Sequence, residues 1–103
     1  MVHEQRRHPR VVIRLPIVCE VPDGEPFVAT VSDLSVGGLS IESSVVPPFG
    51  TQLIIVADFP GDAGLRLAAV VRWARPGGFG VQFGLLGARE THALTGILTR
   101  ARG

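Results

Sequence analysis

The sequence predicts an all-β domain, a six-stranded antiparallel barrel or sandwich with a short helix at its C-terminal end. Three observations support this class. Apolar residues recur at every second position through most of the 103-residue chain, turn signals rich in glycine and proline separate these runs, and no helical pattern stands between successive strands. A chain of this length that is 46% apolar suits one compact domain with one core.

Three strands are predicted in the N-terminal half of the chain. The first covers residues 11–21, where apolar side chains alternate with a more mixed set. The turn "PDGEP" at 22–26 leads to a second strand at about 27–34, and "SVGG" separates it from a short third strand around 39–41. The segment 45–50 is expected to be a loop, because its two adjacent prolines cannot donate hydrogen bonds to a strand ladder.

Three further strands are predicted in the C-terminal half. They cover residues 53–59, 65–73 and 79–83, with tight connections at 60–64 ("PGDAG") and 76–78 ("PGG"). Regular strand spacing with turn signals and no helical crossovers is typical of an antiparallel barrel or sandwich.

Near the C-terminus the spacing of apolar residues changes from every second position to that of a helix. Leu94, Ile97 and Leu98 are spaced to share one face of a short helix that begins at about residue 88. This helix is expected to plug one open end of the barrel. Trp73 and Cys19 lie at inward-facing positions of their strands, so both are predicted to be core residues.

Composition and charge exclude several classes of function. A net charge of +1 does not suggest a general nucleic-acid binder. No apolar run is long enough to cross a membrane or to form a signal peptide, so a cytoplasmic location is expected.

The single cysteine excludes an internal disulfide and a cysteine-based zinc site, and the three histidines lack the spacing of metal ligands. No catalytic motif is present, so neither an enzyme nor a bound cofactor or metal is expected.

Positive charge concentrates near the N-terminus, where Arg6, Arg7 and Arg10 lie close together. Arginine presents a planar fork of N–H donors that matches two phosphate oxygens, or the O6 and N7 atoms of guanine. Pro9 stiffens the segment between Arg6 and Arg10, so two forks on a short arm could close over a flat anionic ligand. The same residues could instead form a solubilising terminus. Residues 1–10 are therefore predicted to be a flexible basic arm ahead of a domain at 11–103.

A second group of polar residues lies at the junction of the second and third strands. Asp33, Ser35 and Gly38 form D-x-S-x-x-G within "VSDLSVGGLSI" (31–41). One interpretation is turn chemistry, in which Asp33 and Ser35 cap backbone N–H groups while Gly37 and Gly38 supply positive φ. The other is ligand binding: the carboxylate accepts hydrogen bonds from guanine N–H groups, the hydroxyl donates or accepts one, and a glycine lets the ligand approach the backbone.

Taken together, R-x-x-x-R at Arg6 and Arg10 and D-x-S-x-x-G at Asp33, Ser35 and Gly38 resemble the motifs of the PilZ domain family. The segments "RLPI", "VVRWAR" and "GFGVQF" fit the same family, so the resemblance covers residues 5–98, nearly the whole chain. It implies a six-stranded PilZ-type β-barrel that binds the bacterial second messenger cyclic di-GMP.

The resemblance also implies a role for each motif residue. Arg6 and Arg10 would grip phosphate and guanine. Asp33 and Ser35 would bind a guanine edge, and Gly38 would keep the backbone low beneath the ligand. Apart from the resemblance, Arg7 and Arg75 are further candidate ligand contacts, with a solvated surface role as the alternative for each.

The predicted function is a non-enzymatic cyclic di-GMP receptor or adaptor that couples ligand binding to an effector protein through ordering of its basic arm. Gln5 stands where many relatives carry another arginine, which leaves open whether one ligand or a stacked pair binds. Two alternatives are a PilZ-like protein-interaction barrel that acts without nucleotide, and a nucleic-acid-binding barrel that uses the arm as a clamp. Few aromatic residues and low net charge disfavour the nucleic-acid barrel. Neither a specific nucleic acid nor membrane insertion is expected.

Overall fold

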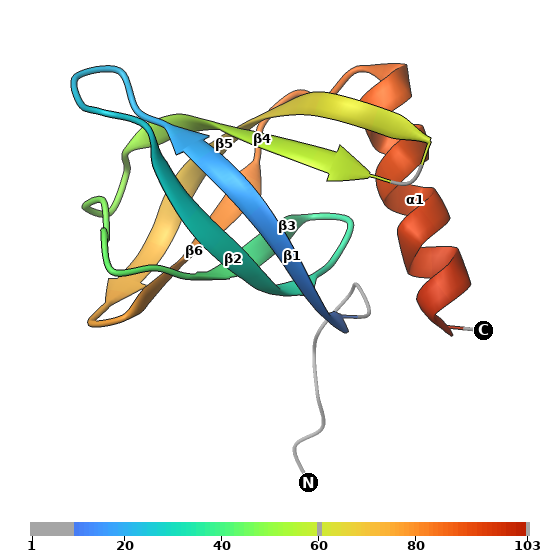
Figure 1. Cartoon of the computed structure of the whole chain (residues 1–103), viewed down its shortest axis with the longest axis horizontal. Helices are drawn as coiled ribbons and strands as arrows, with labels where there is room; N and C mark the ends of the chain where they lie inside the picture. The colour runs from blue at the N-terminus through green and yellow to red at the C-terminus, as the bar shows by residue number, and fades with distance from the viewer. Residues whose placement is uncertain (1–9, 60, 103) are drawn as a thin grey trace, which may run out of the picture.

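The computed structural model of the chain describes residues 10–59 and 61–102, which form a closed six-stranded antiparallel barrel followed by one helix (Figure 1). Around the barrel the strands follow the order β1-β2-β3-β6-β5-β4, and β1 pairs with β4 to close it. In chain order the elements are β1 (Val11–Glu20), β2 (Phe27–Leu34), β3 (Gly38–Glu42), β4 (Gln52–Phe59), β5 (Asp62–Arg75), β6 (Gly78–Phe83) and α1 (Ala88–Arg102). The predicted barrel and C-terminal helix are confirmed.

The barrel is filled by the side chains that point inward from alternate strand positions. This alternation places Cys19, Ile55 and Leu67 fully out of solvent, and Phe79 meets Phe27 edge to face with their ring centroids 6.3 Å apart. Closure pairs every strand on both sides, so the sheet has no long open edge that could pair with another chain.

Helix α1 lies at one end of the barrel, beside the end of β4 and the start of β5 (Figure 1). Ala93, Leu94 and Ile97 are buried in the same core cluster as the strand residues, and the helix packs against β5 and β1. The Nε atom of Arg89 donates a hydrogen bond to Asp62 Oδ1 at 3.0 Å, which ties the first turn of the helix to the start of β5. Within the described ranges, no helix is both long and apolar enough to span a membrane.

The connection between β4 and β5 is tighter than the predicted 60–64 turn. Strand β5 begins at Asp62, and Phe59 pairs with Asp62 across the hairpin. Gly61 and Gly64 adopt φ values of 82° and 68°, a region that favours glycine. Gly61 lies directly before β5, whereas Gly64 lies within it, opposite the register shift between Ala57 and Phe59, so β5 begins earlier than the apolar pattern alone predicted.

The prediction that Trp73 is a core residue is wrong, because β5 contains a β-bulge. Val71 pairs with Val81 and Trp73 pairs with Gly80, so β5 advances by two residues where β6 advances by one. The extra residue reverses the alternation beyond it, and Trp73 lies on the outside of the barrel with 38% of its surface exposed.

Candidate functional site

The candidate site begins at the hairpin between β2 and β3. Asp33 near the end of β2 pairs with Ser40 of β3, just after an irregularity in the ladder between Val31 and Asp33. Leu39 and Ile41 on either side of Ser40 are buried, so the Ser40 side chain points out of the barrel. A carboxylate and a hydroxyl thus stand side by side on the outer surface.

Arg10 binds both of these side chains. Its Nε donates to Asp33 Oδ1 at 2.9 Å, and its Nη2 lies 2.6 Å from the same oxygen and donates to Ser40 Oγ at 3.1 Å. The Arg10 and Asp33 side chains are 30% and 28% exposed, so the ion pair is partly shielded from solvent. Arg10, the second arginine of R-x-x-x-R, is therefore held on the barrel surface beside Asp33. We call Asp33 and the turn that follows it (34–38) the acidic corner.

Ser35 shapes the corner that follows Asp33. It is only 3% exposed, and its Oγ accepts a hydrogen bond from the Gly37 backbone N–H at 3.2 Å. The Ser35 backbone N–H donates to the Gly38 carbonyl at 2.9 Å. Backbone capping by Ser35, predicted as turn chemistry, is therefore present, whereas Asp33 is engaged by Arg10 instead of a backbone N–H group.

Gly37 and Gly38 do not supply positive φ, so that part of the turn interpretation is wrong. Gly38 is needed for a different reason. It pairs with Gln82 of β6, and a Cβ added to Gly38 would collide with the Val81 carbonyl oxygen. A close approach of two strands, and not a backbone reversal, requires glycine here.

An open hollow of about 390 Å³ connects these parts of the surface. Three of the predicted ligand residues, Arg10, Ser35 and Gly38, line it, while Asp33 stands beside it as the partner of Arg10. Arg6 and Arg7, also predicted to contact the ligand, lie outside the described residues. The remaining lining residues are Gly37, Leu39, Arg72, Trp73, Gly80, Val81 and Gln82.

Trp73 forms a wall of this hollow that the sequence interpretation missed. Its indole lies directly over Gly80, where any Cβ would collide with the ring. The Arg75 guanidinium carbon lies 4.8 Å from the Trp73 ring centroid, a cation–π contact. The signal in the sequence was the spacing of Gly78 and Gly80, which share one face of β6 and leave room there for a neighbouring side chain.

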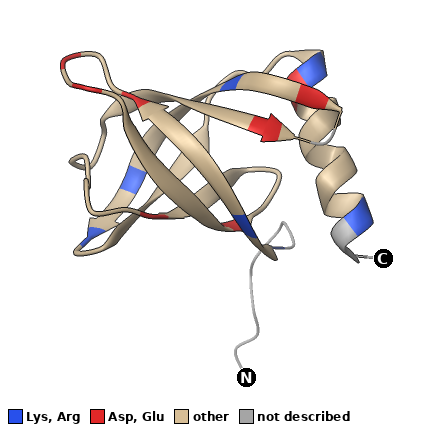
Figure 2. Cartoon of the chain, viewed as in Figure 1, with Lys and Arg blue, Asp and Glu red and all other residues tan. Residues whose placement is uncertain are grey.

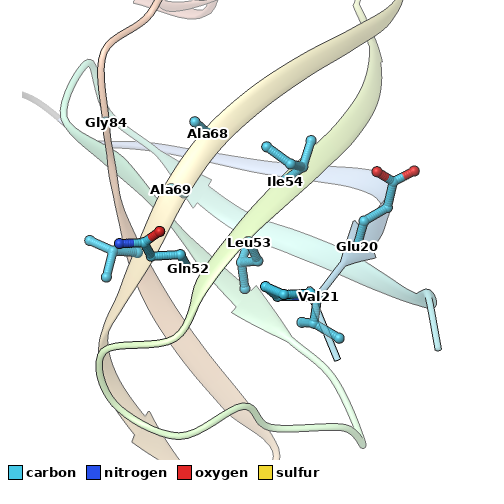
Figure 3. A pocket seen from close by; sticks show the side chains of 10 residues that line it. Glu20, Val21, Gln52, Leu53, Ile54, Ala68, Ala69 and Gly84 are labelled. Carbon is cyan, nitrogen blue, oxygen red and sulfur yellow. The ribbon is translucent and has the colours of Figure 1, made fainter. Parts of the chain in front are cut away.

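A larger hollow of about 600 Å³ lies elsewhere, between the end of β1 and the strands β4 and β5 (Figure 3). Its walls are mainly apolar, as the side chains of Val21, Leu53 and Ile54 show. The one carboxylate in it, Glu20, is paired with Arg66 at 2.6 Å. It offers no converging set of polar groups, and the described residues contain no cluster suited to a metal ion. The hollow beside Arg10 is therefore the candidate site.

Solved structures with a similar fold include PilZ domains. The PilZ domain of CeSA from a cellulose-synthesizing bacterium superposes with a TM-score of 0.75 at 18% identity, covering 92% of this chain and 99% of that one. The PilZ domain of Escherichia coli YcgR, solved with c-di-GMP, gives 0.78 at 13% identity over 96% and 92%. The K. pneumoniae MrkH–c-di-GMP complex gives 0.73 at 17% identity over 95% of this chain and 52% of that one. At these identities, the likeness shows the fold alone.

Sequence comparison supplies the family. A search of curated protein sequences gave no match to the chain. The family model of the PilZ domain, in contrast, matches residues 4–99, a range that includes both arginine positions, the acidic corner and all six strands. Since the match spans nearly the whole sequence, this chain belongs to the PilZ domain family.

Proposed function

We propose that this chain is a non-enzymatic receptor for cyclic di-GMP that acts in the cytoplasm. The observation that supports this most directly is that Arg10, Ser35 and Gly38 line one hollow and that Arg10 binds Asp33 beside it, although Arg10 is more than twenty residues away from the others. The relatives YcgR and MrkH, which share the fold, were solved with this ligand. The ligand carries two phosphates and two guanines, and both groups have acceptor atoms that suit arginine.

Each residue has a distinct role in this proposal. Both Asp33 contacts with Arg10 use Oδ1, so Oδ2 of the same carboxylate is the atom proposed to accept N–H donors of a guanine edge. Ser35 contacts the same edge from the wall of the hollow, while the absent Gly38 side chain leaves space under the base. Arg10 and Arg6 donate hydrogen bonds to the phosphate and guanine acceptors of the ligand.

Four further residues complete the proposed site. Arg72 lines the hollow and adds a cation for a phosphate, and Trp73 offers an aromatic surface on which a purine can stack. Arg75 contributes through its contact with the Trp73 ring, and Arg7 adds a phosphate contact from the arm. Arginines and acidic residues of the described chain are distributed over strands, turns and helix (Figure 2), which favours one mixed-charge ligand site over an extended nucleic-acid surface.

Titration calorimetry tests the binding claim. The chain is expected to bind cyclic di-GMP with a micromolar or lower dissociation constant and not to bind cyclic di-AMP, GTP or single-stranded RNA. Arg10→Ala and Arg6→Ala should each weaken binding by about 1.5–3 kcal/mol, the range for a charged hydrogen bond, or roughly ten- to hundredfold. Arg89→Ala, a change to a helix arginine that does not line the hollow, is the control. Absence of cyclic di-GMP binding by the parent protein would exclude the proposed function.

We further propose that binding is passed to an effector protein through the N-terminal arm. Arg10 is held by Asp33 and Ser40 at the point where β1 begins, so a ligand gripped by Arg6 would draw residues 1–9 against a fixed anchor. The ligand and the arm together would form a new surface for the effector. Ligand-dependent protection of residues 1–9 from protease is the measurable signature.

A further inference from the structure

We propose that Ser40 is a positioning residue for Arg10, which it holds in the orientation that receives the ligand. This inference rests on the proposed function, because it concerns how the same site is prepared for cyclic di-GMP. Ser40 lies outside both R-x-x-x-R and D-x-S-x-x-G, and its side chain does not line the hollow itself. It is assigned by one contact, the hydrogen bond that Arg10 Nη2 donates to Ser40 Oγ at 3.1 Å.

Asp33 alone does not determine the direction of the Arg10 fork. Both of its contacts, from Nε and from Nη2 of Arg10, reach the single oxygen Oδ1. Two donors on one acceptor atom locate the guanidinium but leave it able to pivot about that atom. A second acceptor at a different point removes this freedom, and Ser40 Oγ is that second point.

The backbone that carries Ser40 is well anchored. Ser40 pairs with Asp33 of β2 on one side and with Gly80 of β6 on the other. Its carbonyl oxygen also accepts a hydrogen bond from Ser32 Oγ at 3.2 Å. Because its strand is paired on both sides, the backbone of Ser40 is held in place, and its hydroxyl is a suitable acceptor for a long and otherwise mobile side chain.

Among the described residues these contacts use Nε and Nη2 of Arg10, so the Nη1 side of the fork is the side proposed to receive the ligand. A long side chain that is immobilised before binding loses less conformational entropy when the ligand arrives. Removal of the Ser40 hydroxyl should therefore weaken cyclic di-GMP binding about three- to tenfold, a smaller effect than loss of Arg10 itself.

The experiment compares four proteins by titration calorimetry with cyclic di-GMP: the parent, Ser40→Ala, Ser40→Thr and Thr30→Ala. Thr30 is the matched control, because it is another outward-facing hydroxyl residue of the same sheet, on β2 opposite Pro16 and Glu42. Thermal denaturation of each variant shows whether the fold is kept. The rate of rotation about the Arg10 Nε–Cζ bond, measured by NMR without ligand, reports the contact independently of binding.

The expected result is weaker binding and faster Arg10 rotation in Ser40→Ala, with parent-like values in Ser40→Thr and Thr30→Ala. Equal affinity of Ser40→Ala and the parent would overturn the inference while leaving the proposed function intact. Equal losses in Ser40→Ala and Ser40→Thr would also overturn it, because the loss would then follow from altered packing and not from the hydroxyl. If the parent does not bind cyclic di-GMP, the proposed function fails and this inference fails with it.

Discussion

Gly38 and its neighbour Gly37 illustrate how two identical residues in one motif serve different physical purposes. A Cβ at Gly38 would collide with the Val81 carbonyl oxygen. Gly37 instead contributes backbone hydrogen bonds, since its N–H donates to Ser35 Oγ and its carbonyl accepts from the Phe83 N–H. The glycine of D-x-S-x-x-G is therefore required by strand packing even before any ligand is considered. This requirement was not readable from the sequence, because Val81 is distant in the chain and reaches Gly38 only through the β3–β6 pairing.

The pair allows a matched test of this explanation. Gly38→Ala should lower the free energy of unfolding by about 2–3 kcal/mol, because the strands must separate to admit the methyl group. Gly37→Ala should leave it unchanged or slightly raise it, since Gly37 does not have positive φ and the unfolded chain loses entropy. Chemical denaturation of both variants measures the difference. Similar losses in the two proteins would contradict the close-approach explanation.

In strand β5, alternation of apolar residues predicts the side-chain orientations before the bulge but not those after it. Period two correctly predicted Leu65, Leu67 and Val71 as core residues, and the structure buries all three. The same alternation predicted that Trp73 is a core residue, but the bulge after Val71 reverses the inward and outward positions, so Trp73 faces outward. A bulge depends on how two strands pair, so it is only weakly encoded in either strand alone.

The N-terminal arm, predicted as residues 1–10, is the element on which the proposed signalling depends. Trypsin cleaves after arginine, so the bonds following Arg6 and Arg7 report on the accessibility of this segment. Cyclic di-GMP should slow cleavage at both bonds, because ligand contacts by Arg6 would hold the backbone on the barrel. Mass spectrometry of timed digests measures the rates.

Cleavage after Arg100 and Arg102, at the far end of α1, supplies an internal control in the same digests. Its rate should not depend on ligand. Equal rates at Arg6 and Arg7 with and without cyclic di-GMP would remove the proposed coupling, although binding at the hollow could still stand.

For the whole molecule, the absence of lysine and tyrosine makes alkaline titration unusually simple. All ten basic residues are arginine, so Cys19 is the only side chain whose ordinary pKa lies between about 8 and 11. Cys19 is fully buried, and burial raises the pKa of its thiol from 9.0 to about 12. Above pH 9 the unfolded chain therefore releases a proton that the folded protein keeps, and stability falls as pH rises.

Between pH 8 and pH 10 the free energy of unfolding is expected to fall by about 1.4 kcal/mol. Over this range the thiol of the unfolded chain loses its proton while the folded protein keeps it. Urea denaturation of the parent and Cys19→Ala at the two pH values, with a reductant present, measures it. The alanine variant is expected to be less stable at both pH values because of the cavity, but to show little change between them. If both proteins lose the same stability, the buried thiol is not the cause.

The sequence by itself determined the strands, their order along the chain, the terminal helix and the family motifs. These depend on local periodicity, turn residues and fixed spacing, which a linear chain carries directly. Only the tertiary structure decided that Arg10 meets Asp33 and Ser40, that Gly38 faces the Val81 carbonyl and that Trp73 turns outward. Each of these depends on the register in which two strands pair, and register follows from the burial of one strand face and from turn geometry, which appear only once the strands have come together.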